Sequence, residues 1–497
     1  MKLQPKNTRQ VQSNFRIIRL CVLCVLWSSI PWSTAAPQPN IVLIMADDLG
    51  YGDPGCYGGK TITTPNIDRL ATEGLRFTQA YSGGPVCTPA RAALMTGLHN
   101  GHSIARDNIP HYPTYLHDED LTLAEVLKSS GYRTGGIGKW SLGDAGTSGR
   151  ATNQGFDKFF GYLNQDHAHY YYPEYLDDDE SRLNLTGNTT SRQHYSHDLL
   201  TTHALQFIRE SKRTRNEEQG TRNAAQSHQP FFLYCAYALP HFSAKAEDPD
   251  GFTVPSTAPY TDRPWDEKSK KYAAMVHLLD RDIGKIIDLI ESLNLTDNTL
   301  VIFTSDNGGH KTIHERFDTN GPLRGYKRDL TEGGIRVPFI ARWPGHVPAG
   351  ATSDAIIAFQ DMLPTLADLA GTATPPNLDG ISVLTALKGN KLPEPHPPLY
   401  WDYGHCRGKQ YAQAARLGKW KGIRSRKSGN VMELYNLETD LGETTDLAKT
   451  RPKIVDRIAT FMDQAVTPND RYQIGTTYKG KAIWKKDEPQ NTQNTQK

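Results

Sequence analysis

The chain has 497 residues, of which 37% are hydrophobic, so it is long enough for one large α/β domain and a smaller one. Its 56 Lys and Arg residues nearly balance its 54 Asp and Glu residues, which leaves a net charge of +2. This balance excludes the strongly basic surface that nucleic acids and anionic membranes attract, so we expect neither as a partner.

The first 36 residues have the pattern of a secretory signal peptide. Basic residues precede a short apolar stretch at 20–27, and residues 33–36 are small enough for cleavage. The apolar stretch is shorter than the about 20 residues that cross a bilayer, so we expect no membrane span once the signal is removed. An uncleaved anchor is the alternative. The pattern predicts a secreted or periplasmic protein.

The first element of the mature chain is an apolar, partly β-branched run at 40–46, typical of a strand buried on both faces of a parallel sheet. Asp47 and Asp48 follow it directly. Ligands of open α/β sheets bind beyond the carboxyl ends of the strands, so these two carboxylates are a candidate metal site. The alternative is a solvated acidic turn. Residues 64–74 then predict a helix of the scaffold.

The segment around Cys87 predicts the start of a second helix, with Thr88 as a plausible cap and Gly97 at its end. A side chain at a helix start faces unpaired backbone N–H groups and the positive end of the helix dipole, which stabilise an anion. Arg91, one turn into the helix, adds a planar and always charged donor group. The alternative is a cysteine that only packs as a small hydrophobic residue.

The pattern Cys87-x-Pro89-x-Arg91, followed by Ala-Ala-Leu-Met-Thr-Gly, resembles the signature of the formylglycine-dependent sulfatases. In that family a separate formylglycine-generating enzyme oxidises the cysteine, and the hydrated aldehyde is the nucleophile. The resemblance therefore implies formylglycine (3-oxoalanine) at Cys87, that enzyme as a maturation partner, and Arg91 as a catalytic residue. The commoner family form has Ser before the arginine, where this chain has Ala90.

After a predicted helix at 121–130, a short strand at 132–140 brings Lys139 to its carboxyl end. The resemblance implies that Lys139 contacts the sulfate and the nucleophile. Many family members have a His two positions later, thought to be the base that collapses the sulfated intermediate, and this chain has Ser141. The base is therefore open between a displaced His, an Asp and water.

An aromatic-rich segment at 155–175 places His167 and His169 beside three consecutive tyrosines. Aromatic faces with polar tips suit a sugar-binding rim, while an ordinary packed loop is the alternative. We take four histidines as candidate substrate-binding residues: His167, His169, His310 and, in the polar segment 402–405, His405.

Another buried-strand pattern, at 230–238, is followed by His241. A histidine at a strand's carboxyl end can give a proton to a departing oxygen near neutral pH. The resemblance implies that His241 is the acid that protonates the leaving group. A structural histidine is the alternative.

A long helix at 271–291 leads to a strand at 298–305, which ends in Asp306 and Asn307. This repeats the arrangement seen after the first strand. The hard oxygens of Asp47, Asp48, Asp306 and Asn307 suit Ca²⁺, with Mg²⁺ as the alternative ion.

The glycine-rich segment 321–338 is close to the family pattern, and the resemblance places Lys327 as a second cation that faces the sulfate. A helix at 359–370 then precedes a Gly- and Pro-rich stretch at 371–398, a natural domain boundary. We expect a signal peptide at 1–36, a catalytic domain at 37–385, a C-terminal subdomain at 386–484 and a disordered tail at 485–497. The subdomain has strand patterns at 411–416, 420–424 and 431–434, and a helix pattern at 453–465.

The resemblance extends over about residues 39–450. It implies an α/β fold of the alkaline-phosphatase-like type, with a large mixed or parallel sheet flanked by helices and a smaller C-terminal α+β subdomain. It also implies a sulfuric ester hydrolase, and the export signal and aromatic loop suggest a sulfated polysaccharide or oligosaccharide as substrate. The alternatives are a phosphomonoesterase or phosphodiesterase of the same superfamily, and a non-catalytic protein that binds sulfated glycans.

Overall fold

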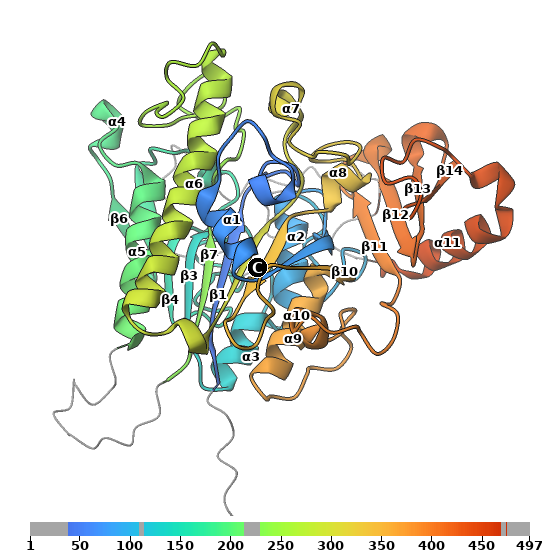
Figure 1. The fold of residues 1–497 in the computed structure, drawn as a ribbon, viewed down its shortest axis with the longest axis horizontal. Helices are drawn as coiled ribbons and strands as arrows, with labels where there is room; N and C mark the ends of the chain where they lie inside the picture. The colour runs from blue at the N-terminus through green and yellow to red at the C-terminus, as the bar shows by residue number, and fades with distance from the viewer. Residues whose placement is uncertain (1–37, 109–113, 213–228, 469–473, 475–497) are drawn as a thin grey trace, which may run out of the picture. The chain divides into compact units, whose positions relative to one another are not determined.

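The computed structural model describes residues 38–108, 114–212, 229–468 and 474. The expected signal peptide and C-terminal tail lie outside these residues. The described chain contains a ten-stranded mixed sheet and a four-stranded sheet, both covered by helices (Figure 1). The predicted α/β class, with a large mixed sheet and a smaller C-terminal part, is confirmed.

The large sheet has the strand order β10-β2-β9-β8-β1-β7-β3-β4-β5-β6. Its central strands, from β8 through β1, β7 and β3 to β4, all run parallel, while β9, β5 and β6 add antiparallel pairs. The carboxyl ends of the central strands therefore meet at one edge. The strands are β1 (Asn40–Ala46), β2 (Leu75–Tyr81), β3 (Arg133–Lys139), β4 (Lys158–Tyr162), β5 (Tyr175–Asp178), β6 (Ser181–Asn184), β7 (Phe231–Ala236), β8 (Thr299–Ser305), β9 (Phe339–Arg342) and β10 (Ala351–Ala358).

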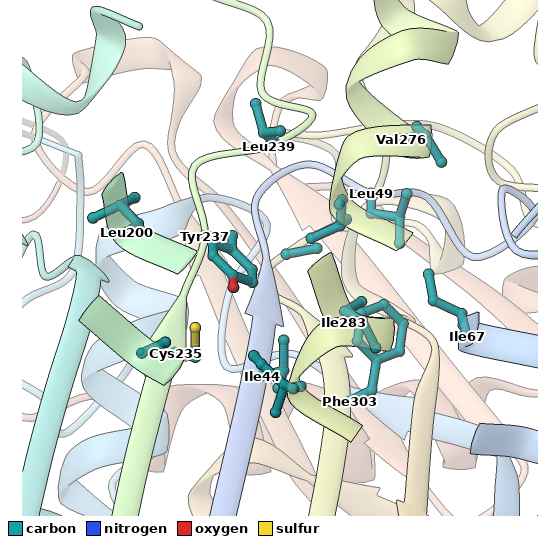
Figure 2. Packing of buried hydrophobic residues seen from close by; sticks show 14 of the residues in the cluster. Ile44, Leu49, Ile67, Leu200, Cys235, Tyr237, Leu239, Val276, Ile283 and Phe303 are labelled. Carbon is teal, nitrogen blue, oxygen red and sulfur yellow. The ribbon is translucent and has the colours of Figure 1, made fainter. Parts of the chain in front are cut away.

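Successive side chains of a strand point to opposite faces of a sheet, and both faces of the central strands are buried in hydrophobic clusters. On β1, Val42 and Ile44 belong to one hydrophobic cluster, and Leu43 belongs to the other. Helices α1 (Pro65–Thr72), α5 (Ser196–Lys212) and α6 (Glu267–Ser292) cover the first face, where Ile283 packs near Ile44 (Figure 2). Helices α2 (Cys87–Thr96), α3 (Leu123–Ser129), α9 (Met362–Leu369) and α10 (Leu384–Leu387) cover the second.

The starts of α6 and α2 differ from the prediction. Helix α6 begins at Glu267, four residues before the predicted position, because the Asp266 side chain accepts a hydrogen bond from the Ser269 backbone N–H and caps it. Helix α2 begins at Cys87 with Val86 in the cap position, so the expectation that Thr88 caps it is wrong. The Thr88 N–H instead donates to Asn108 Oδ1 at 2.8 Å.

Three short helices lie in loops that connect the strands and longer helices. They are α4 (Asn188–Ser191), α7 (Lys311–Phe317) and α8 (Glu332–Ile335). Among the residues that the structure describes, no helix combines the length and apolar character needed to cross a bilayer.

The C-terminal part is an antiparallel sheet covered by one helix. Its elements are β11 (Leu399–Tyr403), β12 (Ala412–Leu417), β13 (Trp420–Ser425), β14 (Met432–Asn436) and α11 (Pro452–Gln464). Ile458 and Met462 of α11 pack on this sheet. We propose that this part begins within 388–398, slightly after the predicted residue 386, since Ala386 and Leu387 pack with the large sheet.

A buried ion-pair cluster ties this small sheet to the large one. The Lys421 ammonium group of β13 lies 2.8 Å from Glu332 Oε1 and 2.9 Å from Glu443 Oε1, and all three side chains are fully buried. Glu332 also accepts a hydrogen bond from the Tyr81 hydroxyl at the end of β2. Burial raises the pKa of Glu332, but Lys421, Arg336 and Arg416 outweigh it and lower the pKa to about 2.

Replacing Lys421 with Met is expected to destabilise the fold by about 3–5 kcal/mol, because two buried carboxyl groups lose the ammonium group that they share. The shift of the urea unfolding midpoint measures this effect. Lys419→Met is the matched control, since Lys419 forms a solvent-exposed pair with Glu438 at 3.0 Å. That pair is worth about 0–1 kcal/mol. Equal midpoint shifts for the two variants would contradict the structural role of the cluster.

Candidate active site

The four predicted oxygen ligands converge at the carboxyl edge of the large sheet. Strands β1 and β8 pair in parallel with Ala46 opposite Ser305, so the residues that follow them lie side by side. The Asp48 N–H donates to Asp306 Oδ1 at 3.2 Å, and Asn307 Nδ2 donates to Asp48 Oδ1 at 2.7 Å. Asp47, Asp48, Asp306 and Asn307 are all buried.

Three cationic side chains meet these carboxylates. Arg91 of α2 lies 2.7 Å from Asp306 Oδ2. Lys139, the last residue of β3, lies 2.6 Å from Asp47 Oδ2, and Lys327 lies 2.7 Å from Asp48 Oδ1. The three positive side chains thus face three carboxyl groups.

Cys87 lies within this cluster as the first residue of α2. Its Sγ is 3.4 Å from Asp47 Oδ1 and 3.6 Å from the Lys327 ammonium nitrogen. Burial, Asp306 and Asp47 raise the pKa of the Cys87 thiol to about 12, although Lys139 and Lys327 act in the opposite direction. The thiol therefore stays protonated at neutral pH and is a poor nucleophile as it stands.

The oxygen groups fit a divalent cation. Asn307 Oδ1 is buried and has no hydrogen-bond partner among the described residues. Carboxylate and amide oxygens are the donors that Ca²⁺ and Mg²⁺ prefer. Burial raises the pKa of Asp47, but Lys139, Arg91 and Lys327 outweigh it and lower the pKa to about 2, so this carboxylate is ionised. With three ionised carboxylates, a divalent cation would give the cluster a net positive charge, which suits an anionic substrate.

His241 adjoins the cluster from the segment after β7. Its Nε2 lies 3.6 Å from Asp48 Oδ2, and its backbone carbonyl accepts a hydrogen bond from the Tyr171 hydroxyl. The ring is buried. The structure therefore brings His241 together with Cys87, Arg91, Lys139 and Lys327, as the sequence predicts.

Two of the four candidate substrate-binding histidines lie next to this group and are partly exposed. The ring of His169 meets that of His241 edge to face, with centroids 4.7 Å apart. His310 precedes α7 and stacks on Phe242 with centroids 4.5 Å apart. Burial, Lys327 and Arg328 lower the pKa of His310 to about 3. Both rings are placed where a substrate could reach them.

The other two candidates lie in the protein interior. His167 packs between Tyr162 and Tyr175 in the wall of a separate cavity of 190 Å³. His405 is fully buried, with Nδ1 3.8 Å from Asp402 Oδ2. His405 is therefore enclosed by protein, while His167 borders a cavity, and its role in substrate binding stays a prediction.

The sequence did not identify the polar side chains that hold His169. Gln165 Oε1 accepts a hydrogen bond from the Ser141 hydroxyl at 2.7 Å, and Gln165 Nε2 lies 3.4 Å from His169 Nε2. Ser243 Oγ lies 2.9 Å from His169 Nδ1. The spacing of four residues between Gln165 and His169 is the signal that could have linked those two.

Comparison with known proteins matches almost the whole described chain. A family model described as Sulfatase matches residues 39–372, and one described as N-sulphoglucosamine sulphohydrolase, C-terminal, matches residues 325–467. Human N-acetylgalactosamine-6-sulfatase is 35% identical over 417 residues, which cover 78% of this chain and 72% of that protein. Rat arylsulfatase G is 32% identical over 490 residues, which cover 86% and 85%.

A solved structure gives the same result. The crystal structure of Ps i-CgsB in complex with k-i-k-neocarrahexaose aligns with a TM-score of 0.73 and 31% identity, over 86% of this chain and 92% of that one. The overall structure and the sequence are thus both similar to proteins named as sulfatases or aligned with that solved structure.

Proposed function

The chain belongs to the formylglycine-dependent sulfatase family of the alkaline-phosphatase-like superfamily, and from this premise we propose that it removes sulfate from a sulfated carbohydrate. As a member of this family it is a sulfatase, a hydrolase of sulfuric esters. The observation that supports this most directly is the position of Cys87 at the start of α2. Its Sγ lies 3.4 Å from Asp47 Oδ1 and 3.6 Å from the Lys327 ammonium nitrogen. One relative is named for N-acetylgalactosamine and another is in complex with neocarrahexaose, which supports a carbohydrate.

The reactive group is formylglycine made from Cys87 by a formylglycine-generating enzyme. Its hydrate supplies a hydroxyl group that can attack sulfur. Lys139 and Lys327 neutralise charge on the sulfate oxygens, and this kind of preorganised stabilisation is usually the largest catalytic term. Arg91 is held by Asp306 and by the Lys139 carbonyl oxygen, so its charge stays fixed beside residue 87. His241 donates a proton to the leaving oxygen.

A divalent cation, Ca²⁺ or alternatively Mg²⁺, would be held by Asp47, Asp48, Asp306 and Asn307. When bound, it polarises the sulfate group and favours the ionised form of the nucleophile. Each of the four residues contributes a hard oxygen, and Asn307 Oδ1 lacks a hydrogen-bond partner among the described residues.

Adding Ca²⁺ to chelator-treated protein is expected to raise the thermal unfolding midpoint and to restore turnover. A ligand at about 100 times its dissociation constant stabilises the folded state by about 2.7 kcal/mol. Asn307→Ala should shift the Ca²⁺ titration to higher concentration. The matched control is Asn390→Ala, because Asn390 is exposed. Identical titrations for Asn307→Ala and the unmodified protein would remove Asn307 from the proposed ligands.

The ester specificity is tested with aryl sulfate, aryl phosphate and a panel of sulfated sugars. We expect turnover of the aryl sulfate and of at least one sulfated oligosaccharide, since the paired lysines and the buried nucleophile position serve sulfate transfer. Faster hydrolysis of the phosphate would favour the phosphoesterase alternative. Binding of sulfated glycans without hydrolysis by protein that carries formylglycine would favour the non-catalytic alternative. Cleavage of sulfated steroids or lipids with refusal of every sulfated sugar would contradict the carbohydrate assignment.

We propose that the protein is exported to the periplasm or the exterior after loss of residues 1–36. The basic and apolar pattern of that segment supports export. The N-terminal sequence of exported protein tests this proposal, because retention of the segment would support the uncleaved anchor.

A further inference from the structure

His169 is fixed in one orientation at the partly exposed side of the catalytic cluster. Its Nδ1 lies 2.9 Å from Ser243 Oγ, and its ring meets the His241 ring at 4.7 Å. Its Nε2 lies 3.4 Å from Gln165 Nε2. The imidazole is thus held by contacts on both nitrogens and on its ring.

The hydrogen bonds around Gln165 define which nitrogen of His169 carries the proton. Gln165 Oε1 accepts from the Ser141 hydroxyl at 2.7 Å, so the amide N–H₂ group of Gln165 faces His169 Nε2. With this amide orientation the neutral ring carries its lone pair on Nε2, and its proton lies on Nδ1 and is donated to Ser243. In this tautomer Nε2 is unprotonated, and it can accept a proton when its 3.4 Å contact with Gln165 opens.

The charges that face His169 keep it neutral in the substrate-free protein. Burial, Lys139, Lys327 and Lys245 hold its pKa well below the usual range, against the opposing effect of Asp47. An anionic sulfate placed beside Lys139 and Lys327 offsets these positive charges and makes Nε2 more basic.

Hydrolysis includes a second proton transfer. A sulfate monoester and water give an alcohol, a sulfate dianion and one free proton. His241 delivers a proton to the alcohol, and a group near residue 87 accepts the proton that residue 87 loses when sulfate departs. His310 is less suited to this, because the Thr312 hydroxyl and N–H both face its Nδ1 and its ring stacks on Phe242.

We propose that His169 is this proton acceptor, an inference that rests on the proposed function. The O–H bond of the free hydroxyl on residue 87 breaks, and its proton passes to His169 Nε2. The released electron pair forms the carbonyl bond of the aldehyde. The bond between the side-chain carbon and the sulfate oxygen breaks, and sulfate leaves with the electron pair of this C–O bond. Nothing is oxidised or reduced in this step.

The test follows the mass of the peptide that contains residue 87 after protein is mixed with excess aryl sulfate. We expect His169→Ala and His169→Asn to react once and then retain one sulfate group, with steady-state turnover reduced by about 10²–10⁴-fold. Adding Ser141→His to His169→Ala should release the retained sulfate, since residue 141 adopts φ 66°, which His tolerates better than most residues. The exposed His194→Ala variant is the matched control and should keep normal turnover.

Two results would overturn the inference while leaving the proposed function intact. One is turnover by both His169 variants close to that of the unmodified protein. The other is loss of turnover in both without retained sulfate, which would place His169 in substrate binding or in the first half of the reaction. Failure of the unmodified protein to hydrolyse any sulfate ester would instead contradict the proposed function itself.

Discussion

Replacing Cys87 with Ala is expected to abolish sulfate ester hydrolysis, with a loss on the order of 10⁶-fold, as when the nucleophile of a hydrolase is removed. Alanine cannot be converted to formylglycine, so the reacting hydroxyl is never made. The lysines, Arg91 and the carboxylates remain, and binding of sulfate esters should persist. Steady-state turnover of an aryl sulfate, compared at equal protein concentration, measures the effect.

The matched control for this variant is Cys56→Ala. Cys56 is partly buried near α1 and takes no part in the group around Cys87. Its replacement should leave turnover close to normal. Full activity of Cys87→Ala would contradict the proposed mechanism, because the nucleophile would then have to be another residue.

Replacing His241 with Gln should affect substrates according to their leaving groups. A sugar alcohol is a poor leaving group and needs a proton, so its release should slow by about 10²–10⁴-fold. An aryl sulfate with an acidic phenol leaves without protonation and should lose far less. The ratio of kcat/KM for the two substrates, in the variant and in the unmodified protein, measures the difference.

His194→Gln provides the control for this comparison, because His194 is an exposed histidine outside the catalytic group. Its substrate ratio should equal that of the unmodified protein. An equal loss on both substrates in His241→Gln would show that His241 acts on the sulfate or on the fold of the site, and would contradict its role as leaving-group acid.

The strand ends could be predicted because local sequence determines them. A buried apolar run followed by acidic residues identifies both β1 with Asp47 and β8 with Asp306, and the observed strands end at Ala46 and Ser305. The parallel pairing of these two strands then brings the carboxylates together. Here a local pattern and one general rule about α/β sheets were sufficient.

Other features depend on contacts between distant parts of the chain. Strand β9 has only four residues, and its insertion between β8 and β2 follows from the packing of the sheet. The burial of His405 could not be read from its polar neighbours, because it results from the fold of the small sheet. The Lys421 cluster likewise joins residues 89 positions apart in the chain. Such pairs carry no signal in the sequence of a single protein.

The orientation of His169 also depends on the fold. The sequence has Ser141 two positions after Lys139, and histidines at 167 and 169. Only the structure shows that His167 points into the wall of a separate cavity while His169 meets His241. Two residues of equal appearance in the sequence thus have different surroundings.

The most direct test of the whole account is the mass of the peptide that contains residue 87, taken from protein produced together with a formylglycine-generating enzyme. We expect the lower mass of an aldehyde in place of a thiol, in a fraction of molecules that matches the fraction active on sulfate esters. A fully active preparation in which every molecule retains the Cys87 thiol would contradict it.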